Sequence, residues 1–322
     1  MFLRIFKSNS VYNFFLVPLT GILLLLGSFL HPESLPRAIV PFSLPFPVPE
    51  VPGTIAVWIN FGLILILCFQ LLFINARYSF VRARTFLPAY LFLFIVLALP
   101  DLHTVQPVFI SAVFLIQAIK RTFDAYEAGK AHSHAFDAGF FTGLAGLFYL
   151  PANLFVLLIP VNIYTIKAKN GWREFVTPFV GVLLPWTFTV SAYYIFSDPA
   201  ILLSLLKEQF IRNESSILLQ WPVRTYFIYL IIITLISSVF IITQYDEKKI
   251  STRRYFKILF FYFVSSLIFF IFRPVSFEIL VILALPLSFL ITNYLTFMRR
   301  RIWAELFFTI LILISVSLQF FY

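Results

Sequence analysis

Long apolar stretches follow one another along almost the whole chain, with short polar connections between them. A helix needs about 20 residues to cross the roughly 30 Å hydrocarbon core of a membrane. Stretches close to that length, or somewhat shorter, predict about eleven spans, at residues 13–30, 54–74, 86–100, 105–119, 135–150, 152–166, 175–196, 225–243, 258–272, 276–297 and 302–321. The pattern therefore predicts an all-α protein, built as a polytopic bundle of transmembrane helices.

The amino-acid composition is that of an integral membrane protein. Of 322 residues, 61% are apolar and only 12% are charged, and the mean hydropathy is +0.95. A water-soluble domain of this size could not bury so much apolar surface. The net charge of +10 suits contact with the headgroups of membrane lipids, so lipids are predicted partners and nucleic acid is not.

Residues 136–166 decide the topology, because they can form either a hairpin of two short helices or one long helix kinked at Pro151. With a hairpin and a cytoplasmic N-terminus, the 24 lysines and arginines lie on the cytoplasmic side except for Arg37, Lys207, Arg212, Arg224 and Arg273. With a single kinked helix they divide evenly between the two sides. Because cytoplasmic loops are enriched in Lys and Arg, the hairpin is favoured. It predicts a multi-pass membrane protein with its C-terminus on the outer side, which in a bacterial inner (cytoplasmic) membrane is the periplasm.

The chain is predicted to form a single membrane domain over residues 1–322, and two of its outside connections carry structure of their own. Residues 31–53 are rich in proline, which forbids regular helix and predicts a stiff lid over the outer face. Residues 197–223 begin with Ser197-Asp198-Pro199, a typical helix start, and continue with leucines at helical spacing. They predict a helix that lies along the outer membrane interface.

Acidic and histidine side chains follow two of the predicted spans on the same, outer side. His31 and Glu33 follow the first span, and Asp101 and His103 follow the third. Three outside arginines accompany them, namely Arg37, Arg224 and Arg273. Arginine binds phosphate with its planar fork, and a carboxylate can act as a general base, so this set suits a phosphorylated, lipid-linked substrate. The alternative is that these charges hold helix ends in water, and His103 in particular is expected at the surface.

This arrangement resembles the GT-C glycosyltransferases, multi-spanning enzymes that transfer sugars from polyprenyl-phosphate carriers. His31-Pro32-Glu33 resembles the His-Pro-acid motif in the first outside loop of some mannosyltransferases of that class. The resemblance implies Glu33 as base or orienting acid and Asp101 as second catalytic acid. From charge and side, we expect His31, Arg37, His103, Arg224 and Arg273 to bind substrate.

Two other features bear on this resemblance. Ser34 stands where the class often has a second carboxylate, so no metal site is predicted and the cofactor stays open. The segments MFLRIFKSNS, FDAGFFTGLAGLFYLP and GWREFVTPFVGVLLP are similar to an uncharacterised inner-membrane family of Bacteroidota, a domain of unknown function. That similarity extends over nearly the whole chain.

Three functions follow as hypotheses. The first is a GT-C-like transferase, or a degenerate relative, that acts on a polyprenyl-phosphate-linked sugar at the outer face. The second is a non-catalytic subunit of a cell-envelope assembly or export machine, with other envelope subunits as partners. A transporter comes third, because the spans hold almost no carboxylates in mid-membrane. His132, His134 and Asp137 are too few ligands for a metal site, and Asp137 is expected to cap a helix N-terminus.

Overall fold

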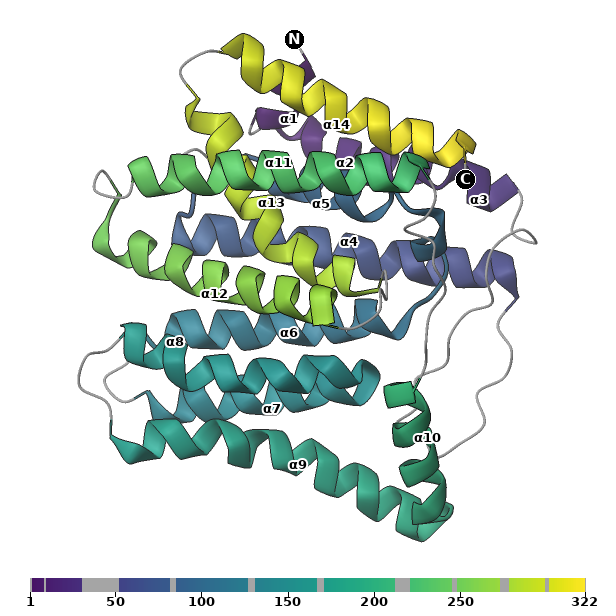
Figure 1. Cartoon of the computed structure of the whole chain (residues 1–322), viewed down its shortest axis with the longest axis vertical. Helices are drawn as coiled ribbons and strands as arrows, with labels where there is room; N and C mark the ends of the chain where they lie inside the picture. Colours follow the sequence, from purple (N-terminus) through teal and green to yellow (C-terminus); the bar gives the residue numbers. More distant parts are fainter. Residues whose placement is uncertain are drawn as a thin grey trace.

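The computed structural model describes residues 2–8, 10–30, 52–81, 85–126, 131–166, 171–211, 221–244, 248–272, 278–298 and 301–321 (Figure 1). Within these ranges the regular structure is helical and no strand occurs. The helices are α1 (Phe2–Lys7), α2 (Tyr12–Leu24), α3 (Leu26–Leu30), α4 (Gly53–Tyr78), α5 (Leu87–Val96), η2 (Pro100–Leu102), α6 (Pro107–Asp124), α7 (His132–Phe148), η3 (Leu150–Leu157), α8 (Leu158–Ile166), α9 (Trp172–Phe196), α10 (Pro199–Ile211), α11 (Trp221–Thr243), α12 (Ile250–Phe272), α13 (Ile279–Phe297) and α14 (Arg301–Phe321).

The predicted all-helical class is confirmed over the described residues. Five helices there are long and apolar enough to cross a membrane: α4, α9, α11, α13 and, over residues 302–319, α14. The shorter apolar helices α2, α5 and η3–α8 overlap three more of the predicted stretches. A helical membrane protein is therefore supported, while the number of eleven spans and a GT-C arrangement stay predictions.

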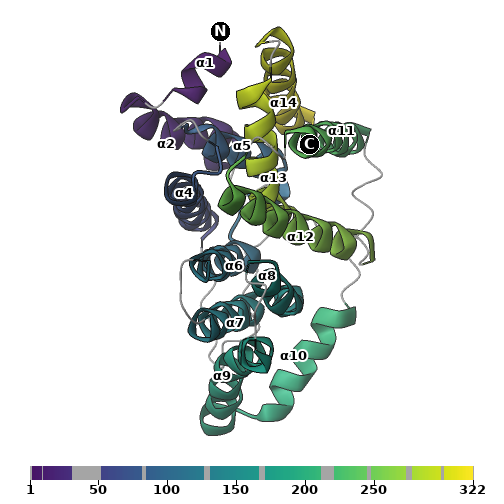
Figure 2. The same ribbon diagram turned by 90° about the vertical axis from the view of Figure 1, so that its left-hand side faces the viewer.

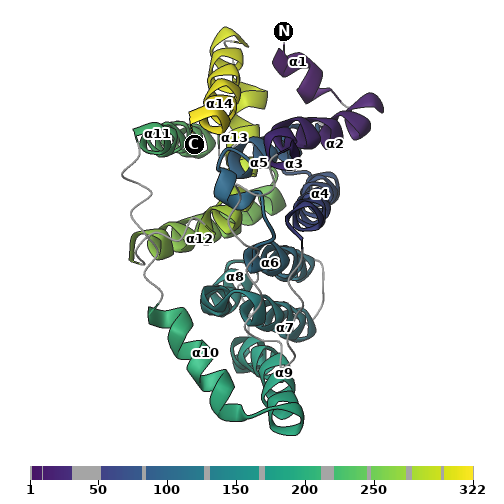
Figure 3. The same ribbon diagram turned by 90° about the vertical axis from the view of Figure 1, so that its right-hand side faces the viewer.

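Two helices, α5 and α13, form the centre of the bundle. All ten residues of α5 are buried, as are residues 279–295 of α13. Figures 2 and 3 show the pair between α4 on one side and α11 on the other. A helix that is apolar all round must be enclosed by protein or lipid, and here protein encloses both. The other helices are therefore arranged around this pair.

An aromatic cluster joins α13 to the helices beside it. The ring of Phe80, just after α4, has its centroid 5.0 Å from that of Phe289 in α13. It also lies 5.4 Å from the centroids of Phe123 in α6 and Phe256 in α12. Because such offset and edge-to-face pairs add to the apolar burial, this cluster fixes the ends of α4 and α6 against α12 and α13.

Glycines allow α7 and α9 to approach each other closely. A Cβ on Gly139 of α7 would lie 2.1 Å from the carbonyl oxygen of Pro178 in α9, and one on Gly181 of α9 would lie 2.4 Å from that of Phe136. Gly139 and Gly143 form a G-x-x-x-G pattern, the small-residue spacing typical of membrane helix pairs. The helices α6, α7 and α9 stack in this order away from the central pair (Figures 2 and 3).

Residues 132–166 fold as two antiparallel helical segments. The helix α7 runs in one direction, and η3 with α8 returns beside it (Figure 1). The turn between them is tight enough for Gly146 to lie against the side chain of Asn153, which accepts a hydrogen bond from Trp186 Nε1 at 3.1 Å. The structure therefore has the hairpin that the distribution of Lys and Arg favours, and not one long kinked helix.

The two ends of the bundle differ in charge. One end of the bundle holds the C-termini of α4 and α6 and the N-termini of α9 and α12. Basic residues lie in or beside these termini, namely Arg77, Arg121, Arg173 and Lys248. We call this the basic end. The helix α10 crosses the opposite end at a steep angle to the other helices (Figure 1), and we call this the α10 end. Lys207 of α10 and Arg224 of α11 belong to it.

Asp137 does not cap a helix, contrary to the prediction. The helix α7 begins at His132, so Asp137 lies in its second turn, and its carboxylate is 3.6 Å from Arg121 Nε of α6. The helix begins earlier because Ala131 and Ala135 are buried in one apolar cluster with Ala125, just after α6. Among the described residues, no cluster of three or more histidine, cysteine or acidic side chains could hold a metal ion.

The glycine contact makes a prediction about stability. Gly139→Ala places a methyl group against the backbone of α9, so we expect a loss of about 1–3 kcal/mol from overpacking. Gly62→Ala in α4 is the control, because nothing lies within 4 Å of the added Cβ, and alanine favours helix. Thermal unfolding of the detergent-purified variants measures both. Equal unfolding temperatures for the two variants would contradict the close α7–α9 contact.

Candidate functional site

The helix α5 ends inside the protein, at the α10 end, where its last carbonyl groups need partners. A helix leaves its final four C=O groups without intrahelical donors. Here side chains supply the donors: Ser315 Oγ to Phe94 O at 2.8 Å, Tyr226 OH to Ile95 O at 2.5 Å, and Gln319 Nε2 to Leu97 O at 3.3 Å. These donors come from α11 and α14, so three helices meet at the end of α5.

His103 joins the same carbonyl groups to α3. Its Nε2 is 3.0 Å from Leu97 O, and its Nδ1 is 2.6 Å from Ser28 Oγ. Because a carbonyl only accepts, Nε2 carries the proton, and Nδ1 accepts from the Ser28 hydroxyl. The side chain is only 2% exposed. The expectation that His103 lies at the surface is therefore wrong: the buried carbonyl of Leu97 requires a donor, and His103 supplies it.

Burial also sets the charge of this imidazole. It lowers the pKa of His103 to about 4, against a smaller opposite effect of the hydrogen bond to the Leu97 carbonyl. His103 is therefore neutral at pH 7, in agreement with a ring that donates at one nitrogen and accepts at the other. Both ring nitrogens of His103 are engaged in hydrogen bonds within the fold. The predicted role of His103 in binding substrate stays a prediction, and it would require the hydrogen bond to Ser28 or to Leu97 to break.

The turn from η2 to α6 contains buried polar atoms that the described chain leaves unpaired. Asn60 Nδ2 of α4 donates to Leu102 O at 2.8 Å, and Gln106 Nε2 donates to Asp101 O at 3.3 Å. Their oxygens, Asn60 Oδ1 and Gln106 Oε1, and the hydroxyls of Thr104 and Ser111 are buried without a hydrogen-bond partner among the described residues. Buried polar groups are normally paired, so this turn has capacity for a bound polar group or water.

Asp101 lies in this turn and is half-buried. It is the first-turn acidic residue of η2, between the capped end of α5 and the start of α6. The structure thus places Asp101 and His103 in one turn, where both ring nitrogens of His103 are engaged and Asp101 is half-buried. Arg224 lies exposed in the first turn of α11, at the same end of the bundle. His31, Glu33, Arg37 and Arg273 lie outside the described residues.

We call the turn at residues 100–106, together with Asn60 and Ser111, the polar turn. It combines a carboxylate with amide oxygens and hydroxyl groups that can accept hydrogen bonds. Such a set suits a ligand with several hydroxyl groups. Sequence reasoning found Asp101 and His103 but missed Thr104, Gln106 and Ser111. For Thr104 and Gln106 the signal was present, because they lie beside His103 between two apolar segments, whereas Ser111 lies inside the second apolar segment.

The fold and this site define a helical membrane protein with a rigid polar turn at one end. Comparison of the sequence gives its family: the chain belongs to the family of unknown function DUF6427, whose sequence profile matches residues 1–322. No curated protein and no solved structure matches the chain. The predicted likeness to an uncharacterised family over the whole chain is thus confirmed. A source in Bacteroidota and a GT-C topology stay predictions.

The buried His103 predicts a loss of stability in acid. An unfolded chain binds a proton at this histidine below about pH 6.5, whereas the folded protein does so only near pH 4. The free energy of unfolding therefore falls as the pH falls from about 6.5 to about 4, by ~3 kcal/mol, and the contribution is complete above this window.

Thermal unfolding of the detergent-purified protein between pH 7.5 and 4.5 checks this expectation. His103→Gln keeps a donor but does not titrate, so the variant should lose less stability over the window than the wild type. The other three histidines are the same in both proteins, so the comparison removes their effect. Parallel curves for the two proteins would show that His103 is not the group responsible.

Proposed function

We propose that this chain is a membrane-embedded transferase, or a degenerate relative of one, that handles a sugar linked to polyprenyl phosphate at the α10 end. The observation that carries the proposal is the polar turn, where a half-buried carboxylate lies beside buried amide and hydroxyl oxygens without partners among the described residues. A sugar offers the several hydroxyl donors that such oxygens accept.

In this proposal Asp101 acts with Glu33 at the outer face of the inner membrane. A carboxylate there orients or deprotonates an acceptor hydroxyl, and arginine binds the carrier phosphate. Arg224, exposed at the same end of the bundle as Asp101, is the arginine that the described chain offers for this role. Arg37, Arg273 and His31 are the further candidates from sequence.

The distribution of charge supports the orientation that the proposal needs. The helix termini at the basic end carry most of the described lysines and arginines, and cytoplasmic surfaces are enriched in both. We therefore assign the basic end to the cytoplasm and the α10 end to the periplasm. The helix α10, which crosses the ends of the other helices (Figure 1), then lies along the outer interface.

A second candidate function is a non-catalytic subunit of an envelope assembly. It is favoured by α9, because only 22% of the most apolar 18-residue segment of this helix is buried. The helix exposes large apolar side chains in its second half, namely Phe188, Tyr194, Ile195 and Phe196. Such a helix contacts lipid or a second membrane protein. The engagement of both His103 nitrogens within the fold also suits a structural rather than a chemical role for that residue.

Charge removal at Asp101 tests the choice between these functions. Asp101→Asn keeps the shape of the side chain but removes the base, so a transferase should lose about 100-fold or more of its activity while it remains folded. Glu33→Gln is expected to do the same. The readout is consumption of polyprenyl-phosphate sugar by membranes that contain the variant, together with rescue of a deletion strain.

Asp198→Asn is the matched control at the same end. Asp198 precedes α10 and accepts from Ala200 N through Oδ1 at 2.9 Å, a contact that asparagine can also make. This variant should keep full activity. If Asp101→Asn and Glu33→Gln both rescue the deletion as well as the control does, the catalytic proposal should be abandoned in favour of the subunit.

A further inference from the structure

An apolar groove remains where α11 and α12 both pack on α13. Figure 1 shows α13 crossing between the other two helices. The groove has a volume of about 450 Å³. The described residues that line it are Ser238, Ile241 and Ile242 of α11, Phe256, Lys257 and Phe260 of α12, and Leu290 of α13. Most of these side chains are apolar, so the groove suits a hydrocarbon ligand.

The groove has a buried floor and an exposed rim. Ile241, Phe256 and Leu290 are buried and form the floor. Ile242 and Phe260 are 68% and 40% exposed and form the rim. The groove therefore opens on the outer surface of the bundle, between α11 and α12.

This part of the surface faces lipid. The helix α11 is long and apolar enough to cross a membrane, and it exposes Leu235 and Val239 beside the groove. In α12, no charged residue occurs after Lys257 over residues 258–272. Surfaces of this kind are stable in hydrocarbon and not in water. The open side of the groove is therefore filled from the membrane.

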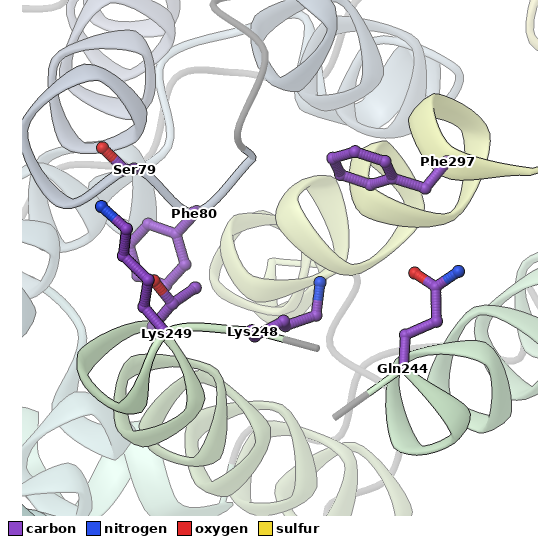
Figure 4. A pocket seen from close by; sticks show the side chains of 7 residues that line it. Ser79, Phe80, Gln244, Lys248, Lys249 and Phe297 are labelled. Atoms are coloured by element: carbon purple, nitrogen blue, oxygen red, sulfur yellow. The ribbon is translucent and has the colours of Figure 1, made fainter. Parts of the chain in front are cut away.

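Toward the basic end the groove meets a polar cavity of about 280 Å³. That cavity is lined by Ser79, Phe80, Gln244, Lys248, Lys249, Thr252 and Phe297 (Figure 4). Phe256 separates the two spaces, because it lines the groove and its ring centroid lies 5.1 Å from the Lys248 ammonium. Lys257 is exposed at the rim, as expected of a lysine whose stem packs on apolar groups while its ammonium stays at the membrane surface. The groove therefore leads from that surface into the hydrocarbon.

The size of the groove fits a single chain. A helix with its side chains is about 10 Å across, so about one turn of helix would fill this volume. At roughly 30 Å³ for each chain carbon, which is also the share of a water molecule in the liquid, the groove holds about 15 carbons. This is the length of one acyl chain, whereas a polyprenyl chain has several times more carbons.

We propose that the groove between α11, α12 and α13 holds one acyl chain of a phospholipid from the leaflet at the basic end. The site is separate from the polar turn and does not depend on the transferase proposal. Moving a chain from lipid into the groove gives no hydrophobic gain, because both surroundings are apolar. Van der Waals contact with the fixed walls retains the chain, and an empty groove would lose this contact. The chain thereby completes the packing between α11 and α12.

Photo-crosslinking in lipid nanodiscs tests the proposal. The probe is phosphatidylethanolamine with a diazirine in one acyl chain, and mass spectrometry of the digested protein locates the label. Leu290 should be labelled. Leu287 of the same helix is the matched control and should stay unlabelled, because both side chains are 2% exposed but only Leu290 lines the groove. A lipid that moves over the outer surface reaches neither of them.

A variant that narrows the groove supplies the second measurement. Ser238→Leu should remove the label from Leu290. Ser265→Leu, at a half-buried position of α12 outside the lining, should leave it in place. Excess unlabelled phosphatidylethanolamine should compete for the groove, and polyprenyl phosphate should not.

The labelling pattern of the wild type decides the proposal even where a variant does not fold, which size-exclusion profiles establish. The proposal is overturned if Leu290 stays unlabelled or if Leu287 is labelled equally. It is also overturned if a folded Ser238→Leu protein keeps the label at Leu290. Removal of the label by polyprenyl phosphate alone would identify a different occupant and would overturn it too.

Discussion

The carbonyl groups at the end of α5 impose the constraint on which the α10 end of this protein depends. The helix has ten residues and ends among apolar side chains, where no water can bond its last carbonyls. Ser315, Tyr226, His103 and Gln319 supply the donors, from α14, α11 and the turn that follows α5. One set of hydrogen bonds therefore ends the central helix and joins three outer segments to it.

This arrangement also makes the polar turn rigid. Asn60 binds Leu102, Ser28 binds His103 and Gln106 binds the main-chain oxygen of Asp101, so the turn that carries the Asp101 side chain is held in a defined place. Positioned carboxylates on a rigid support are what transfer chemistry requires. At the other end of the bundle, lysines beside the start of α12 surround a cavity instead. The two ends therefore present different side chains: a carboxylate with amide and hydroxyl groups at one, and lysines at the other.

Hydropathy alone predicted the helical class and the approximate position of the helices, because each needs a long apolar stretch. The charge distribution predicted the hairpin at α7 and α8. The environment of His103 could not be predicted, since it follows from the end of α5 at Val96 and from the approach of α3. The cavity lined by Lys248 and Lys249 was also missed, because in the sequence these residues indicate topology and the cavity forms only where four chain segments meet. The close contact between α7 and α9 at Gly139 could not be predicted, because the sequence does not show which helix packs against this glycine.

The central claim is that Asp101 in the polar turn and Glu33 after α3 serve one site at the α10 end. A cryo-EM structure of the protein in lipid nanodiscs gives the separation of the two carboxylates most directly. The account predicts a separation within about 10 Å across a shared cleft, the scale on which paired acids act on one sugar. Carboxylates farther apart than that, each directed into bulk solvent, would contradict it and leave both residues as charges at helix ends.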